Sequence, residues 1–319
     1  MFSRFGTVSL GGGPVPRLIA FHEELRPLTL RLLSVHAHPD DESSKGAATY
    51  AYYLDRGVEV MVVSCTGGER GSVLNESLEP RIWAERDMGG LRRVEMAAAQ
   101  AAVGFQHRWL GYHDSGWIEP ESGDPLPVNS FGAIPVEISA QPLVKLIREF
   151  RPQVLITYDE KGGYPHPDHI RTHEVSMRAW ELAADASAHP ELGEAWSISK
   201  LYYDRTMNPA RFEAVFDYLT KELPEHALLK TLTEMRGWVD GRPHLATVSI
   251  PAGAFFDVRD RALRAHASQV APDHPFFFWP NDILQTAWPY EDYQLVQSRV
   301  EVTSTGPETD LFDGVEDQA

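Results

Sequence analysis

The sequence predicts an α/β protein, a Rossmann-like three-layer αβα sandwich with a mostly parallel sheet and a smaller C-terminal α+β part. From residue 28 to about residue 205, short apolar runs alternate with helix-type segments, which is typical of a parallel sheet covered on both faces. Gly57 stands where a helix C-terminus places glycine, between one such segment and the next run. Polar motifs directly follow two of the runs, at the edge of the sheet where ligands bind.

The individual elements follow from these patterns. In the first part of the chain, we expect strands at residues 30–37, 58–64, 107–110 and 154–158, and helices at residues 43–56, 81–102, 138–149 and 166–186. After residue 201 the pattern is less regular, and it indicates strands at residues 202–203 and 244–250 and a helix at residues 257–269.

The composition narrows the class of partner. Asp and Glu outnumber Lys and Arg by 46 to 29, for a formal charge of −17, and no basic stripe is present. A polyanion would be repelled at long range, so nucleic acid is disfavoured. No apolar stretch is long enough to cross a bilayer, and Cys65 as the single cysteine allows no intramolecular disulfide. We therefore expect a cytoplasmic protein with no membrane partner, and a buried Cys65.

Two related motifs carry the chemistry. His38-Pro39-Asp40-Asp41 ends the first expected strand, and His166-Pro167-Asp168-His169 lies just past the strand at residues 154–158. A hydrolytic zinc site takes three ligands from His, Asp or Glu and keeps a position open for water. His38 and Asp41 converge once the chain turns, and His169 completes the set. The sequence thus predicts a metal site of His38, Asp41 and His169, for zinc or, nearly as well, Fe²⁺.

The remaining motif residues are expected to act on the substrate. Asp40 lies beside the metal but is free, as a general base must be. His166 either protonates a leaving amine or stabilises a tetrahedral oxyanion. Asp168 is expected to orient His166 and raise its pKa.

Simpler roles exist for the same residues. Asp41 or Asp168 can cap the helix that follows it, and that role can coexist with chemistry. His36 shares the strand face of His38, but we expect it to pack in the core rather than bind metal. A non-catalytic sugar-binding or nucleotide-binding module is a further alternative, disfavoured because no Gly-x-Gly-x-x-Gly turn follows the first strand.

The two motifs also resemble a known family. Residues 37–42 (AHPDDE) and 163–169 (GYPHPDH) are similar to those of LmbE-like (PIG-L) zinc deacetylases, which remove acyl groups from N-acylglucosamine derivatives; residues 66–71, 92–96 and 114–116 extend the match. The resemblance implies the same ligands and base. It adds Tyr164 as a phenol that donates to the oxyanion, and Arg92 and Asp114 as contacts to substrate hydroxyls.

Each added contact has a plain alternative. Arg92 can make a helical ion pair with Glu95, and Asp114 can shape a turn. Lys45 lies in Ser43-Ser44-Lys45-Gly46, which resembles the amidases of the actinobacterial thiol-metabolism branch, but it can equally be a solvated helix residue.

Residues 262–269 and 307–312 resemble the same branch. They imply an amidase that cleaves the glucosamine to acylcysteine amide of mycothiol S-conjugates in thiol detoxification, with a glucosaminyl-inositol thiol conjugate as its small-molecule partner. The alternative is an N-acetyl-glucosaminyl-inositol deacetylase. The family loop tends to carry glutamate after Gly71, whereas this chain has Ser72.

With these expectations the chain divides into four parts. They are an N-terminal extension of residues 1–27 without the features of a signal peptide, a catalytic core of residues 28–200, a C-terminal part of residues 201–302 that lines the substrate cleft, and a loosely held polar tail of residues 303–319. At 319 residues, one large unit remains as possible as a core with an appendage. Nothing in the sequence indicates an oligomeric state.

Overall fold

A computed structural model describes residues 29–119, 122–302 and 308–315 of the chain. Its centre is one seven-stranded sheet in the order β3-β2-β1-β4-β5-β7-β6. The strands are β1 (Arg31–His36), β2 (Glu59–Thr66), β3 (Gln106–Tyr112), β4 (Val154–Thr157), β5 (Lys200–Asp204), β6 (Val248–Ile250) and β7 (Glu291–Ser298). The pairs among β1 to β5 are parallel, and β7 runs antiparallel to both β5 and β6. The predicted α/β class is confirmed.

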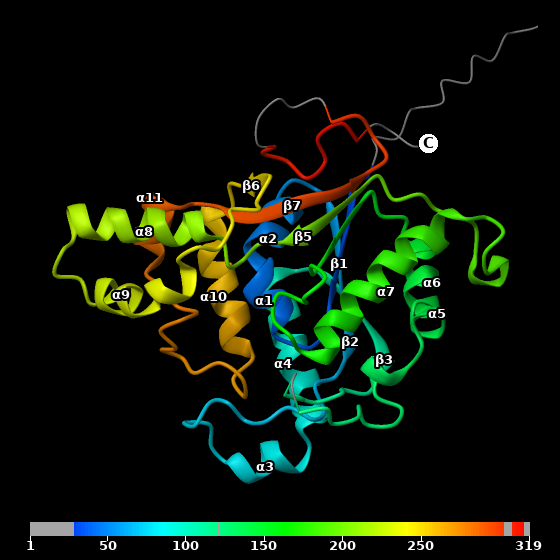
Figure 1. Cartoon of the computed structure of the whole chain (residues 1–319), viewed down its shortest axis with the longest axis horizontal. Helices are drawn as coiled ribbons and strands as arrows, with labels where there is room; N and C mark the ends of the chain where they lie inside the picture. The colour runs from blue at the N-terminus through cyan, green and yellow to red at the C-terminus, as the bar shows by residue number, and fades with distance from the viewer. Residues whose placement is uncertain (1–28, 120–121, 303–307, 316–319) are drawn as a thin grey trace, which may run out of the picture.

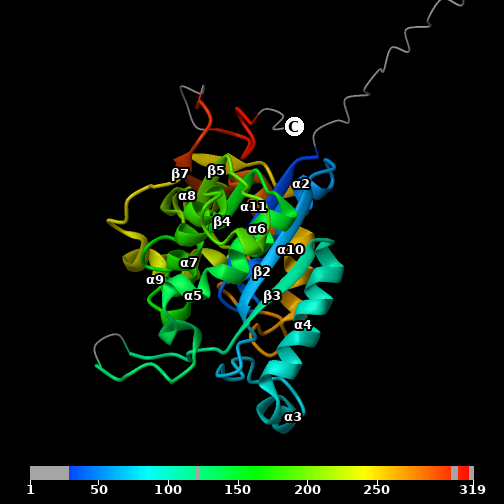
Figure 2. The ribbon, with the colours of Figure 1, turned by 90° about the vertical axis from the view of Figure 1, so that its right-hand side faces the viewer.

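Helices cover both faces of this sheet (Figures 1 and 2). They are α1 (Asp41–Lys45), α2 (Ala47–Leu54), α3 (Arg81–Arg86), α4 (Met88–Val103), α5 (Val136–Ser139), α6 (Gln141–Phe150), α7 (Pro167–Ala184), α8 (Pro209–Glu222), α9 (Ala227–Val239), α10 (Phe256–Ala265) and α11 (Asn281–Ala287). Neighbouring strand residues point to opposite faces, so Leu32 packs with the α2 and α4 side and Leu33 with the α6 and α7 side. Both leucines are fully buried.

Two predicted helices are interrupted. The expected helix at residues 43–56 breaks at Gly46, where a Cβ would overlap the ring of Tyr50. The expected helix at residues 81–102 breaks at Asp87, whose carboxylate accepts from the Gly90 amide and starts α4. Three helices and a strand, α8, α9, α11 and β7, were not predicted.

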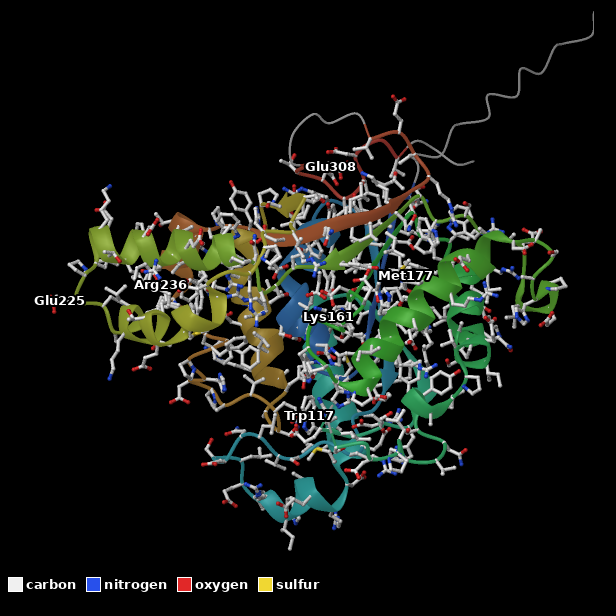
Figure 3. The ribbon with its side chains drawn as sticks, viewed as in Figure 1. Trp117, Lys161, Met177, Glu225, Arg236 and Glu308 are labelled. Atoms are coloured by element: carbon white, nitrogen blue, oxygen red, sulfur yellow. The ribbon has the colours of Figure 1, made fainter. Side chains whose placement is uncertain are left out.

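The C-terminal elements join the same sheet, because β5 pairs with β4 on one side and with β7 on the other. The helices α8 and α9 project beyond it, and Figure 3 marks Glu225 in the turn that joins them. No helix among the described residues is long and apolar enough to cross a membrane. Residues 1–27 lie outside the described residues, and the division of the chain into four parts remains a prediction.

The expectation of a loosely held tail is wrong for residues 308–315. Leu311 is fully buried, and the Glu308 carboxylate accepts from Lys200 Nζ at 3.0 Å and from Tyr202 at 3.1 Å. Lys200 is itself fully buried, so this ion pair fixes the segment against β5. The polar composition of this segment therefore did not indicate that specific contacts hold it in place.

Candidate metal centre

Both motifs lie where the direction of the sheet reverses. Starting at β1, the chain first adds β2 and β3 on one side and then adds β4 and β5 on the other. His38 follows β1, and His169 lies in the first turn of α7, after β4. Ligands of open α/β sheets bind outside the carboxyl ends of the strands at such a switch point. The topology thus brings together two motifs that are 128 residues apart.

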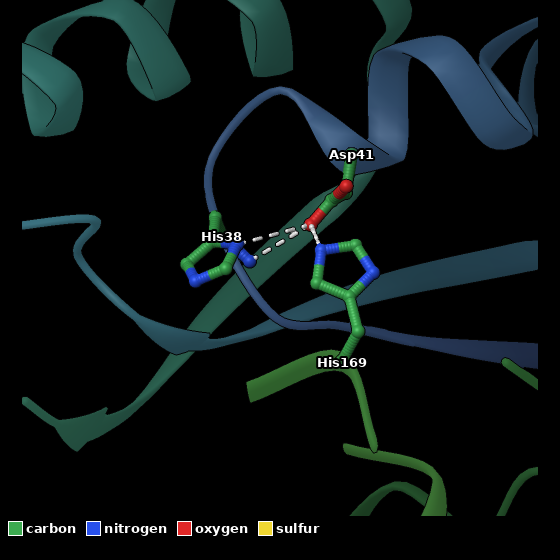
Figure 4. A group of neighbouring side chains, drawn as sticks. All are labelled: His38, Asp41 and His169. Carbon is green, nitrogen blue, oxygen red and sulfur yellow. Dashed lines mark hydrogen bonds and ion pairs between the residues drawn. The ribbon is translucent and has the colours of Figure 1, made fainter. Parts of the chain in front are cut away.

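Three side chains converge at this point (Figure 4). Asp41 Oδ2 lies 3.3 Å from His169 Nε2 and 3.7 Å from His38 Nδ1, and one ligand atom from each residue lies within 4.8 Å of the others. All three residues are buried. Asp41 Oδ2 also accepts from the backbone amide of His38 at 3.0 Å, which holds the turn in place.

The proton on the His169 ring can be assigned from its neighbours. His169 Nδ1 lies 2.9 Å from the Gly162 carbonyl, which can only accept, so Nδ1 carries the proton and Nε2 has the lone pair. Nε2 is buried without a hydrogen-bond partner among the described residues, and it faces a carboxylate. Burial lowers the pKa of His169, which keeps the ring neutral. Two lone pairs that face each other in a buried site fit a cation between them.

Gly162 is required for this arrangement. Its φ of +70° suits glycine, and a Cβ at this position would overlap the side chain of His169.

The Asp168 carboxylate lies within hydrogen-bond distance of the His38 ring. His38 Nε2 lies 3.2 Å from Asp168 Oδ2 and 3.6 Å from Asp114 Oδ1, so its Nδ1 is left for Asp41. The Asp168 carboxylate also accepts from the backbone amide of Ser115, at 2.8 Å, and from its hydroxyl. Burial opposes protonation of His38, but these carboxylates raise its pKa to about 10. A positive charge is favoured here, whether a proton or a metal supplies it.

The expected pKa of His166 needs a correction. Its Nδ1 accepts from the backbone amide of Asp168 at 3.1 Å. Burial and the charge of His38 lower the pKa of His166 to about 4, although the Asp168 carboxylate acts in the opposite direction. The ring is therefore neutral near pH 7, with its proton on Nε2.

His166, and neither predicted aspartate, caps α7 through that bond. The start of α1 likewise has no side-chain cap, so the capping alternatives for Asp41 and Asp168 do not occur.

Asp40 has a strained backbone and a charged partner. Its φ of +104° is uncommon for a residue with a side chain and costs about 1–3 kcal/mol. The Asp40 amide donates to Glu42 at 2.9 Å, and its carboxylate accepts from Arg92 at 2.5 Å. Burial raises the pKa of Asp40, and Arg92 opposes this rise. The carboxylate is one quarter exposed and lines the cavity.

The residues expected to contact substrate all line one cavity, together with Asp40. Arg92 pairs with Asp40 and the Pro39 carbonyl, not with Glu95. Asp114 accepts from the Arg70 and Gly116 amides, so it also shapes a turn. Lys45 Nζ lies 2.5 Å from Asp41 Oδ1 and is half-buried rather than solvated.

Tyr164 lies at the mouth of this cavity. It is 43% exposed, and its ring stacks on Trp117 with 6.4 Å between centroids. Burial raises the pKa of its phenol, which stays protonated and able to donate.

The cavity has a volume of about 620 Å³, and the strand order places its lining residues on both sides of β1 and β4, the strands that precede His38 and His169. We call the two ends of this lining the near lobe and the far lobe. The near lobe lies over β2 and β3, and its wall includes Arg70, Ser72, Arg92, Asp114 and Trp117. The far lobe lies beyond Lys45 and Asp204, over β5 and β7, with walls from α8, α9 and residues 276–279. Residues after 201 thus line this cavity, and their expected role in lining the substrate cleft remains a prediction.

Sequence reasoning missed one buried ion pair beside the site. His266 Nε2 lies 2.7 Å from Glu42 Oε1, and both side chains are fully buried. Burial opposes both charges, but each partner overcomes it, lowering the pKa of Glu42 to about 2 and raising that of His266. The only signal was that Glu42 and His266 each lie in a segment of the family resemblance. His36 packs as expected, fully buried within hydrogen-bond distance of Tyr50 and Tyr158.

Comparison with known proteins agrees with this geometry. The family model described as PIG-L, GlcNAc-PI de-N-acetylase, matches residues 33–180. The chain belongs to this PIG-L (LmbE-like) family of deacetylases and amidases, which are hydrolytic enzymes. The non-catalytic module considered from the sequence is therefore set aside.

Individual relatives are more specific. The chain is 46% identical over 295 residues to a mycothiol S-conjugate amidase of Streptomyces coelicolor, covering 91% of this chain and 99% of that protein. It is 40% identical over 305 residues to a 1D-myo-inositol 2-acetamido-2-deoxy-alpha-D-glucopyranoside deacetylase of Streptomyces scabiei, covering 92% of each.

Solved structures share the fold at low identity. The N,N'-diacetylchitobiose deacetylase of Pyrococcus horikoshii matches with a TM-score of 0.56 and 18% identity, covering 83% of each chain. A 4-carboxy-2-hydroxymuconate hydratase of Pseudomonas putida has the same TM-score at 17% identity, covering 86% of this chain and all of that chain. Fold alone thus leaves the reaction open.

Proposed function

We propose that this protein is a zinc-dependent amidase that hydrolyses the glucosamine to acylcysteine amide of mycothiol S-conjugates. The hydrolytic part rests on the buried Nε2 of His169, which faces Asp41 and has no hydrogen-bond partner in the part of the chain that the structure describes. His38 Nδ1, Asp41 Oδ2 and His169 Nε2 would hold the ion. The ion would supply Lewis-acid polarisation of the amide carbonyl and lower the pKa of the attacking water. Fe²⁺ suits the same donors.

Asp40 is placed to move the proton. Its carboxylate borders the cavity beside Asp41, and Arg92 holds it in one orientation. It takes a proton from the attacking water and then delivers that proton to the glucosamine nitrogen as the C–N bond breaks. One residue thereby serves as base and then as acid, and the proton count balances.

His166 and Tyr164 stabilise the oxyanion in this mechanism. With Nδ1 accepting from a backbone amide, the neutral ring of His166 has only its Nε2–H to donate. The protonated phenol of Tyr164 is a second donor at the cavity mouth. Neutral donors aimed at developing charge contribute most when water is excluded. Of the two roles considered for His166, we therefore assign oxyanion stabilisation, with Asp168 supporting the site through His38.

The shape of the cavity favours a conjugate over a small acetylated precursor. Arg92 and Asp114 in the near lobe suit the hydroxyl groups of a glucosaminyl-inositol. A substrate that consists of this polyol and an acetyl group would leave the apolar side chains of the far lobe without a contact. Lys45 lies between the lobes, next to Asp41, where the acyl group of the substrate would pass. The higher identity to the amidase supports the same choice. We place the reaction in the cytoplasm, where reduced thiols form conjugates.

The rival is deacetylation of the N-acetyl-glucosaminyl-inositol precursor, which the 40% identical relative supports. The two are separated by assaying the bimane conjugate of mycothiol and the acetylated precursor with the same zinc-loaded sample. We expect kcat/KM for the conjugate to be at least about tenfold higher. A higher kcat/KM for acetate release would reject the amidase assignment.

A further inference from the structure

The far lobe contains an arginine that the proposed reaction does not use. Arg211 lies in the first turn of α8 and lines the cavity, with its guanidinium over the ring of Trp279, 5.0 Å from the centroid. Among the described residues, no carboxylate lies within ion-pair distance of it and no hydrogen bond engages it. Burial lowers its pKa to about 10, so the group stays charged near neutrality. The described residues therefore leave its donors unused.

The acids around Arg211 are occupied by other donors. Asp292 accepts from Ser249 at 2.6 Å, and from Asn208 and Trp288 at 2.9 Å. Glu291 Oε2 accepts from the Thr49 amide at 2.8 Å. The nearest competing cation, Arg259, pairs with Asp260 at 2.9 Å. Arg211 thus remains available to a ligand, although Glu291 and Asp292 reduce its net field.

Apolar side chains line the far lobe beside these charged groups. They are Phe212, Met235, Val239, Phe276, Phe277 and Trp279. An aromatic ring bound here would contact these apolar side chains over much of its surface and would have the Arg211 guanidinium at one side.

We infer that the far lobe binds the thiol substituent of the conjugate and selects an aromatic substituent that carries a carboxylate. This inference rests on the proposed function, because the substituent is the one part of such a substrate able to use apolar walls. The strand order places the polar near lobe on the other side of β1 and β4, so a polyol and an apolar substituent can occupy the two lobes at once. The amide that joins them then lies at the metal ligands.

The test compares four mycothiol conjugates that differ only on sulfur: S-methyl, S-benzyl, S-(4-carboxybenzyl) and S-(4-aminomethylbenzyl). We expect kcat/KM to rise about tenfold from methyl to benzyl, because apolar surface is buried. We expect it to rise a further roughly threefold to tenfold with the carboxylate, because a charge-assisted bond forms. Equal values for all four, or a preference for the ammonium compound, would overturn the inference.

Two variants localise the effect. Arg211→Gln should bring the ratio of carboxybenzyl to benzyl close to one, and Phe276→Ala, at a partly exposed position, should lower the ratio of benzyl to methyl severalfold. The controls are Arg178→Gln, an ion-paired arginine on the outer side of α7, and Ile138→Ala, an exposed position on α5. If the controls change the ratios as much as the test variants, the far lobe is not the selecting site.

A binding measurement separates this inference from the proposed function. The probes are N-acetyl-S-benzylcysteine and its 4-carboxybenzyl analogue, titrated calorimetrically into the zinc-loaded protein and into Arg211→Gln. Tighter binding of the carboxybenzyl compound to the parent alone supports the far lobe even if no conjugate is cleaved, which would reject the amidase. Equal binding of both compounds to both proteins rejects the far lobe even if conjugates are cleaved.

Discussion

The guanidinium of Arg92 donates to the carboxylate of Asp40 at 2.5 Å, across a strand-to-helix turn in which Asp40 has a φ of +104°. Arg92 is almost completely buried, and Asp40 keeps a quarter of its carboxylate exposed toward the cavity. Arg92 was predicted to contact substrate hydroxyls, and the structure gives it a second task. It holds the side chain of a strained residue in the orientation that proton transfer needs.

The first prediction concerns Asp40 itself. Asp40→Asn keeps a hydrogen-bonding side chain next to Arg92 but removes the base, so we expect kcat to fall about 10²–10⁴-fold. Zinc content should stay near one per chain, because Asp40 is not among the three proposed ligands. Steady-state assay and metal analysis of the same sample check this. Full activity would remove Asp40 from the mechanism, and Asp55→Asn, at an exposed site, is the control.

The second prediction concerns the ligand set. His169→Ala should lose zinc, because it removes the buried Nε2 that faces Asp41. His173 lies one turn further along α7 and bonds to the Tyr158 carbonyl, so His173→Ala is a matched control that should retain the metal. Metal stoichiometry after dialysis decides the question. Equal zinc in both variants would contradict the proposed ligands.

The third prediction concerns Asp204. Burial raises the pKa of its carboxyl group from the ordinary value of 3.8 to about 6. Because the folded-state pKa is the higher one, ionising Asp204 costs folding free energy as pH rises from about 4 to 6. Asp204→Asn removes that cost. The free energy of unfolding of Asp204→Asn, relative to that of the parent protein, should therefore increase by about 1–2 kcal/mol between roughly pH 4.5 and pH 8.

Urea unfolding at the two pH values measures this gain. Asp217→Asn, an exposed carboxylate on α8, should show no comparable change. A gain for Asp204→Asn that is independent of pH, or that reverses sign, would show that its carboxyl is not held near pH 6.

The fourth prediction concerns the ion pair of Glu42 and His266. Both side chains are fully buried, so His266→Ala leaves a buried carboxylate without its cation and should cost about 3–5 kcal/mol of stability. Glu42→Gln in the His266→Ala background should recover part of that loss. A double-mutant cycle by urea unfolding gives the coupling. Additive effects of the two changes would mean that the pair does not act as a unit.

Much of the fold and site could be predicted because their signals are local. His38 and Asp41 are three residues apart, and His169 follows a strand that the apolar run Val154–Thr157 marks clearly. What sequence reasoning missed depends on distant pairing. Glu42 meets His266 across 224 residues, and Glu308 meets Lys200 across 108. No local pattern in the sequence encodes such contacts. The pair of Glu308 and Lys200 is the reason why the expectation of a loosely held tail was wrong.

The hydrogen bond of the Asp168 carboxylate was missed for the same reason. Sequence proximity favoured His166, two residues away, whereas the fold places His38 against its carboxylate. The unpredicted helix α8 did carry a local signal, since Asn208-Pro209 caps its start and Phe212, Val215 and Leu219 are buried on one face.

The most direct test of the account is hydrolysis of a mycothiol S-conjugate by the zinc-loaded protein in ¹⁸O-labelled water, followed by mass spectrometry of the products. Such a conjugate has two amides, one to glucosamine and one to the acetyl group on cysteine. We expect free glucosaminyl-inositol and one ¹⁸O in the carboxylate of the N-acetylcysteine conjugate. Labelled acetate, with the amide to glucosamine intact, would contradict it.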